Sequence, residues 1–104
     1  VLGYTTADAQ LAGNVPTDRR YQAAVKLVQQ GNYEQAKTEL NAIMQRGGSL
    51  APYAQYYHAL ASFRQRLYGQ ARTTLRQLTE RYPTWRRLDE AYYLLASTGM
   101  ESGQ

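Results

Sequence analysis

The sequence contains no cysteine, one histidine and no long apolar run. Without cysteine, the 104 residues can form no disulfide, thiol nucleophile or thiolate metal site. No segment approaches the roughly eighteen apolar residues of a membrane-spanning helix. The apolar–polar alternation of a half-buried strand is also missing. These absences favour one small all-α domain.

The residue combinations that support catalysis are absent as well. His58 has no carboxylate four residues away on either side, which predicts a packed or half-buried histidine and not a metal ligand. Asp89 and Glu90 are adjacent, so on a helix they diverge, and they suit the positive end of the helix dipole. The Gly-Gly-Ser run at 47–49 lacks the lysine and the strand of a phosphate-binding loop. We therefore expect no enzyme activity, no cofactor and no metal.

Charge is distributed unevenly along the chain, whose net charge is +4. Residues 49–88 hold seven arginines and one glutamate, a local net charge of +6, whereas residues 1–18 and 89–104 hold acids and no base. A basic middle could attract an acidic partner. The simpler interpretation is an Arg-rich helix face exposed to water.

Five helices are expected between Gly, Pro and Asn breaks. Residues 1–17 are small and polar and are interpreted as an arm or linker, with Thr17 or Asp18 as the first N-cap. The chain has no initiator Met and no signal-peptide pattern, so we expect a processed or excised chain from which any signal peptide is already gone. Helices are predicted at about 19–30, 33–46, 49–65, 68–82 and from 85 or 88 to 100.

Two phrases, NYEQAKTEL at 32–40 and LYGQARTTL at 67–75, show an internal repeat of 35 residues. The fifth helix continues the series with a step of 37 residues. A unit of two helices with small residues at the contact, such as Ala24 and Ala36, is a helical hairpin that must stack on a neighbour to bury its apolar face. The aligned positions are Tyr21/Tyr56/Tyr93, Ala24/Ala59/Ala96, Tyr33/Tyr68, Ala36/Ala71, Leu40/Leu75 and Ile43/Leu78.

This pattern resembles the tetratricopeptide repeat. The matching positions are a small residue in the first helix, an aromatic at the turn, an alanine twelve residues after the small one, and a closing proline: Ala24, Tyr33 and Ala36, then Ala59, Tyr68, Ala71 and Pro83. The resemblance implies stacked antiparallel helical hairpins in a right-handed superhelix, with two and a half repeats at 18–48, 49–84 and 85–104. The departures are Leu27, Ser62 and Gly99 at the usual aromatic position, Gly-Gly closing the first repeat, and Arg66 at the turn glycine.

The wording ERYPTWRRLDEAYYLLA at 80–96 is similar to bacterial cell-envelope members of the family. These members include outer-membrane assembly lipoproteins and repeat modules that precede periplasmic solute-binding domains. The resemblance implies a periplasmic or envelope-associated location.

The resemblance also implies where a partner binds, because the first helix of each repeat lines a concave groove. The leading hypothesis is a non-catalytic protein–protein interaction scaffold that binds a peptide or a neighbouring domain. Aromatic and arginine side chains dominate binding energy at protein interfaces. The alternative is that the tyrosines pack between helices. The candidate groove residues are Tyr21, Tyr53, Tyr56, Phe63, Arg64 and Tyr93.

Two other functions remain open at this stage. A 35-residue period and the phrase AIMQRGGSLAP at 42–52 resemble the pentatricopeptide repeat, which suggests RNA binding by the Arg-rich second repeat. Tyrosine stands where base-reading residues would be short and polar, so we expect no nucleic-acid partner. The third function is self-association: helix five either caps the array or forms a homodimer through an uncovered stripe of Leu94, Leu95 and Met100.

Overall fold

The computed structural model describes residues 15–103, and their regular structure is entirely helical. The prediction of an all-α chain with five helices is confirmed over this range. The helices are α2 (Val15–Gln29), α3 (Tyr33–Arg46), α4 (Ala51–Arg64), α5 (Tyr68–Arg81) and α6 (Leu88–Glu101).

The first helix begins earlier than the sequence pattern indicates. α2 starts at Val15, so the last three residues of the expected arm are helical, and Thr17 and Asp18 lie inside the helix instead of capping it. Pro16 suits this start, because a first-turn residue needs no backbone N–H. The rest of the expected arm, residues 1–14, lies outside the described residues.

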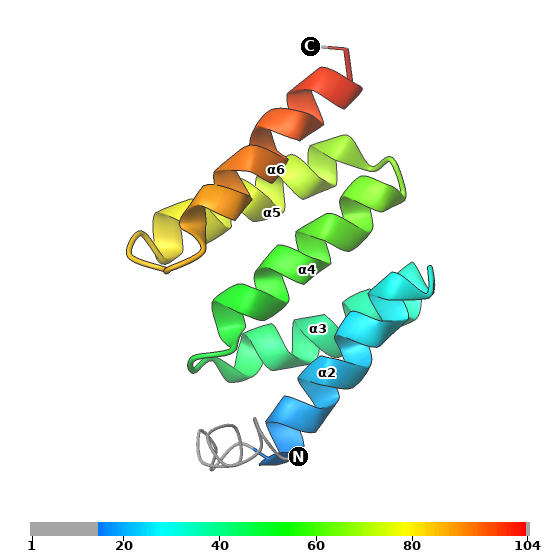
Figure 1. The fold of residues 1–104 in the computed structure, drawn as a ribbon, viewed down its shortest axis with the longest axis vertical. Coiled ribbons are helices and arrows are strands. Elements are labelled where there is room, and N and C mark those ends of the chain that lie inside the picture. The colour runs from blue at the N-terminus through cyan, green and yellow to red at the C-terminus, as the bar shows by residue number, and fades with distance from the viewer. Residues whose placement is uncertain (1–14, 104) are drawn as a thin grey trace.

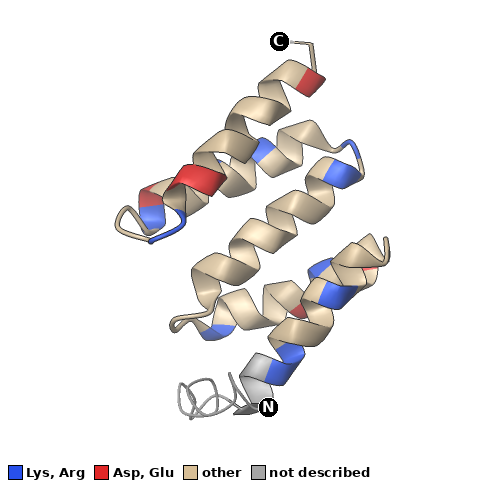
Figure 2. Ribbon diagram, in the orientation of Figure 1, with Lys and Arg blue, Asp and Glu red and all other residues tan. Residues whose placement is uncertain are grey.

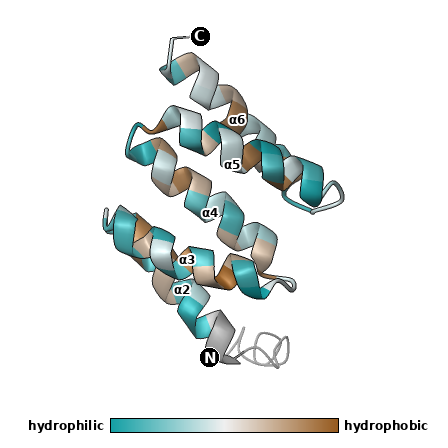
Figure 3. Ribbon diagram, turned by 180° about the vertical axis from the view of Figure 1, so that it is seen from behind, coloured by the Kyte–Doolittle hydropathy of each residue, from teal (hydrophilic) through white to brown (hydrophobic). Residues whose placement is uncertain are grey.

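The hairpins stack on one another so that their helices form two layers (Figure 1). α2, α4 and α6 lie side by side in the front layer, and α3 and α5 cross behind them. Each helix packs mainly on the helices next to it in the sequence, with direct contacts also between α2 and α4 and between α4 and α6. The view from behind (Figure 3) shows many hydrophilic residues on the outer side of α3 and α5, as expected for helices that bury one face only.

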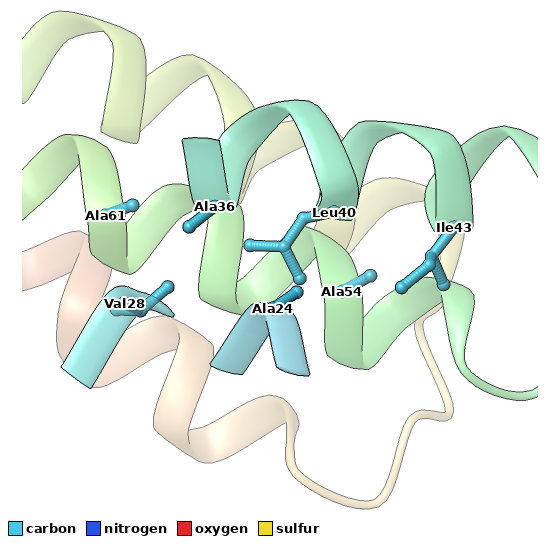
Figure 4. Close-up of a cluster of buried hydrophobic side chains, with 7 residues drawn as sticks. All are labelled: Ala24, Val28, Ala36, Leu40, Ile43, Ala54 and Ala61. Atoms are coloured by element: carbon cyan, nitrogen blue, oxygen red, sulfur yellow. The ribbon is translucent and has the colours of Figure 1, made fainter. Parts of the chain in front are cut away.

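The first hydrophobic core lies between α2, α3 and α4 (Figure 4). Its large side chains, Leu40 and Ile43, come from α3, and small residues surround them. Alanine lets the helix backbones approach closely while the leucine and isoleucine fill the next layer, as the repeat pattern predicts. The buried residues are Ala24, Val28, Ala36, Leu40, Ile43, Ala54 and Ala61.

The second core lies between α4, α5 and α6 and contains Ala59, Leu75 and Leu78 at the positions of Ala24, Leu40 and Ile43. Ala91 and Leu94 of α6 complete it, and Leu95 packs against it. The predicted uncovered stripe is therefore wrong for Leu94 and Leu95, because this side of α6 faces the preceding hairpin. Met100, the third residue of that stripe, is 78% exposed.

The same hydrogen-bonded turn ends α2 and α4. At Gly31 (φ 85°) the backbone N–H donates to the Val28 carbonyl at 3.1 Å, and the N–H of Asn32 donates to the Leu27 carbonyl at 2.9 Å. The bonds recur 35 residues later, where the left-handed residue is Arg66 with φ 66°. This C-cap satisfies the last carbonyls of the helix. Arg66, which stands where the repeat pattern has glycine, adopts the conformation that the cap requires. Gly103 is also left-handed and lies after α6 at the equivalent position, 37 residues beyond Arg66.

A polar contact at an equivalent place links each hairpin to the next helix. Lys37 Nζ donates to Gln65 Oε1 at 2.9 Å, joining α3 to the C-terminal end of α4. The corresponding pair is Arg72 and Ser102, in which the guanidinium Nη2 donates to the hydroxyl oxygen at 3.2 Å. Arg72 follows Lys37 by 35 residues, and Ser102 follows Gln65 by 37 residues. The two repeat steps found in the sequence therefore also relate equivalent contacts between the stacked helices.

Candidate functional site: an aromatic surface

Three of the six candidate groove residues come together at the first half of α4. Tyr21 of α2 meets Tyr53 edge to face, with ring centroids 6.4 Å apart. Tyr57 connects Tyr21 to Tyr56, with centroid distances of 6.1 and 5.4 Å. Tyr53, Tyr56 and Tyr57 can share one patch because residues three and four apart lie on the same side of a helix. The tyrosines thus join the first helices of two successive repeats.

Two residues of the loop between α5 and α6 complete the patch. The Trp85 ring lies 5.1 Å from that of Tyr53 and 6.2 Å from that of Tyr56. The Arg87 guanidinium carbon lies 5.6 and 6.0 Å from the same two ring centroids, within cation–π range. We call the set Tyr21, Tyr53, Tyr56, Tyr57, Trp85 and Arg87 the aromatic surface; all six side chains are half-buried.

The loop holds its two residues through successive backbone turns. The Trp85 N–H donates to the Tyr82 carbonyl and the Leu88 N–H donates to the Trp85 carbonyl, each at 3.1 Å. Pro83 cannot continue a helix hydrogen-bond ladder, so α5 ends before it. The tryptophan and the arginine therefore extend from a short, ordered connection.

Glu90 orients the cation of the aromatic surface. Arg87 donates through Nη2 to Glu90 Oε1 at 2.6 Å and through Nε to Glu90 Oε2 at 3.1 Å, a bidentate pair. The hydrogen bonds raise the pKa of Arg87 and lower the pKa of Glu90, so both groups are charged near neutral pH. Burial, and then the charge of Glu90, raise the pKa of the Tyr56 hydroxyl. Tyr56 therefore stays a neutral hydrogen-bond donor.

The other three candidate groove residues lie elsewhere. Phe63 packs on the Tyr68 ring at 5.4 Å, near the turn between α4 and α5, and against the second core. Arg64 is exposed in the last turn of α4. Tyr93 is 78% exposed on α6 and enters no ring pair found among the described residues.

The sequence pattern did not indicate three members of the aromatic surface. Tyr57 had a usable signal, because it follows Tyr53 by four residues on a predicted helix. Trp85 and Arg87 had none, since a loop has no periodicity that assigns its side chains to a face. Their places depend on how the second hairpin stacks on the first.

Two hollows lie away from the six candidate residues. One, of about 460 Å³, lies between α3, α4 and α5 and is lined by Met44, Gln55, Gln77, Glu80, Arg81 and Tyr82. The other, of about 400 Å³, lies between α2 and α3 and includes Ala23 and Leu27. Residues 15–103 contain no cluster of three metal-ligating side chains. His58 is half-buried, as expected, and burial followed by the charge of Lys37 lowers its pKa.

The sequence matches the family described as YfiO, outer membrane lipoprotein, over residues 14–104. The chain belongs to this family. The predicted resemblance to bacterial cell-envelope proteins with tetratricopeptide-like repeats is therefore confirmed. The family is a non-enzymatic one of protein-interaction modules in the envelope.

No curated protein and no solved structure matched the chain. A membrane-spanning helix needs a longer apolar stretch than any helix among residues 15–103 provides.

Proposed function

We propose that this domain is a non-catalytic scaffold of the bacterial envelope, on the periplasmic side, and that it binds a peptide segment or a neighbouring domain on the aromatic surface. Membership of the YfiO family supports the envelope location. The proposal rests chiefly on one observation: aromatic rings from α2, α4 and the α5–α6 loop converge on a half-exposed patch around an oriented arginine.

The side-chain chemistry of the patch suits protein recognition. Tyrosine and tryptophan provide large apolar area with little rotamer entropy to lose, and arginine is the charged residue most common among binding hot spots. Arg87 is already positioned by Glu90 at 2.6 Å, so a partner would not need to order it. The hydroxyls of Tyr53 and Tyr56 would supply hydrogen bonds at the rim of an apolar contact.

The arrangement of the arginines does not favour a nucleic-acid partner. Figure 2 shows Lys and Arg on several helices and in the turns between them. Arg72 binds Ser102, and Arg87 binds Glu90 and lies against tyrosines. A protein or peptide remains the partner that the site chemistry supports.

Site-specific photo-crosslinking tests this proposal. A photoreactive phenylalanine analogue replaces Tyr53 or Tyr56 in the chain, which is then irradiated in an envelope extract. Gln70, exposed on α5, takes the same analogue as a matched control. We expect a discrete adduct from positions 53 and 56 and none from position 70. Equal labelling from all three positions, or no adduct at all, would contradict the proposal.

A binding measurement with the crosslinked segment completes the test. Tyr56→Ala should weaken binding by about tenfold or more, the effect typical of an interface hot spot. Tyr56→Phe should retain most of the affinity if the ring matters more than the hydroxyl. Gln70→Ala should leave the affinity unchanged.

A further inference from the structure

Beyond Asp89 in its first turn, one side of α6 is exposed although its residues are apolar or aromatic. We call Tyr92, Tyr93, Ala96 and Met100 the end face; they lie on one side of the helix by their spacing. Tyr92 is 53% exposed, and Tyr93 and Met100 are each 78% exposed. Ala96 is exposed as well. None of the four carries a charge.

The positions equivalent to Ala96 and Met100 in the two preceding repeats are covered. The 37-residue step relates Ala96 to Ala59, and a further 35 residues lead to Ala24; both of these alanines are fully buried. Met100 corresponds to Phe63, which is half-buried, and to Val28, which is fully buried. The second helix of each hairpin covers these positions, α3 on α2 and α5 on α4. One side of α6 thus resembles the side that packs against a second helix in the two preceding repeats. Residues 15–103 provide no second helix for α6.

The opposite end of the stack is built differently. Ala54 and Ala61, which face the preceding hairpin from α4, correspond to Arg19 and Lys26 in α2, and both of these charged residues are exposed. Charged residues on an outer side let a repeat array end in water. The end face has tyrosine, alanine and methionine instead, which are residues suited to contact with another protein segment.

We propose that the end face binds an amphipathic helix supplied from outside residues 1–104. This helix would carry a small residue, a leucine four positions later and an aliphatic residue three positions after that. The α3 set Ala36, Leu40 and Ile43 and the α5 set Ala71, Leu75 and Leu78 define the pattern. Docking there continues the interfaces that α2 makes with α3 and α4 makes with α5.

A second copy of the chain does not fit as the occupant. Within residues 15–103, α3 and α5 are the helices with the required pattern, and their leucines Leu40 and Leu75 are fully buried. A second copy would have to unfold a hairpin to provide one of them. The small residue of the incoming helix would lie against Ala96, where the lack of bulk lets two backbones approach closely.

A titration followed by NMR tests this inference. The probe is a synthetic peptide with the sequence of residues 67–82, added to the ¹⁵N-labelled chain. We expect shift changes concentrated in residues 92–103, with an affinity that Ala96→Arg weakens by about tenfold or more. Ala23→Arg, at an exposed alanine of α2, is the matched control and should leave binding unchanged. A peptide with lysine in place of Ala71 and Leu75 should not bind.

Three results would overturn the inference: no binding at millimolar peptide, binding that Ala96→Arg does not alter, or a dimer in sedimentation that Ala96→Arg dissociates. The last result would identify a second copy as the occupant. Tyr53→Ala should not change binding of this peptide, which separates the end face from the aromatic surface. Because Ala96 is exposed, Ala96→Arg should fold with an unchanged circular dichroism spectrum.

Discussion

The first hairpin, α2 with α3, and the second, α4 with α5, have the same backbone plan built from different side chains. Their cores match through Ala24 and Ala59, Leu40 and Leu75. In both hairpins one residue of the turn between the helices adopts the left-handed conformation. This residue is Gly31 in the first hairpin and Arg66 in the second. The geometry of the repeat is therefore conserved between hairpins even where the favoured residue type is not.

The two hairpins differ most in how many neighbours their first helices have. α2 is covered on one side, whereas α4 is buried between α3 and the second core. Even polar residues of α4 are buried, such as Gln55, which donates to the Thr74 carbonyl at 3.0 Å, and Ser62, whose hydroxyl oxygen has no hydrogen-bond partner among the described residues. The difference teaches that position in the stack, and not the helix sequence alone, decides burial. Four experiments compare the two hairpins, three of them through matched substitutions.

The largest effect is expected from removing the matched core leucines. Leu40→Ala and Leu75→Ala should each lower the free energy of unfolding by about 2–5 kcal/mol, because both side chains are fully buried. Urea denaturation followed by circular dichroism measures the loss. If the hairpins unfold as one cooperative unit, both variants retain a single transition. Two transitions in Leu75→Ala would show that the first hairpin is stable without the second.

Enlarging the equivalent alanines should separate covered from uncovered helices. Ala59→Leu should destabilise the fold by about 1–3 kcal/mol, since a larger side chain has no room in a packed core. Ala96→Leu should change stability by less than about 0.5 kcal/mol, because Ala96 is exposed. Thermal unfolding of the two variants makes the comparison. A large loss in Ala96→Leu would mean that another part of the molecule covers α6.

Exchanging the turn residues should have opposite effects in the two hairpins. Gly31→Ala should destabilise by about 1 kcal/mol, because a side chain disfavours positive φ. A Cβ added there would meet no atom within 4 Å, so the effect is conformational. Arg66→Gly should stabilise by up to about 1 kcal/mol for the same reason. Shifts of melting temperature with opposite signs would confirm this, and shifts of equal sign would contradict it.

The smallest effect is a pH dependence specific to the second hairpin. Burial lowers the pKa of His58 below 6.5, so the unfolded chain binds the proton more readily than the folded chain. The neutral histidine therefore contributes stability that is present above pH 6.5 and lost as the pH falls through and below that value. The melting temperature should fall between pH 7.5 and 5, and His58→Gln should flatten this dependence. An unchanged slope in His58→Gln would assign the effect to other groups.

Much of the architecture could be predicted because the repeat supplies redundant information. Ala36 and Ala71 share a position in two copies, so one alignment indicated the helix pairs, their turns and the core layers. The aromatic surface was predicted only in part. Tyr21, Tyr53 and Tyr56 were found from helical register, whereas Trp85 and Arg87 belong to a loop whose path periodicity does not describe.

The sequence by itself determined the all-α class, the two hairpins and their register, because 3.6-residue periodicity and a fixed repeat are local properties of the chain. Tertiary structure alone decided which equivalent residues are buried. Ala59 and Ala96 are the same residue at the same repeat position, yet one is fully buried and the other exposed. The physical reason is that burial depends on the neighbouring helix: α5 covers the first alanine, and no described helix covers the second.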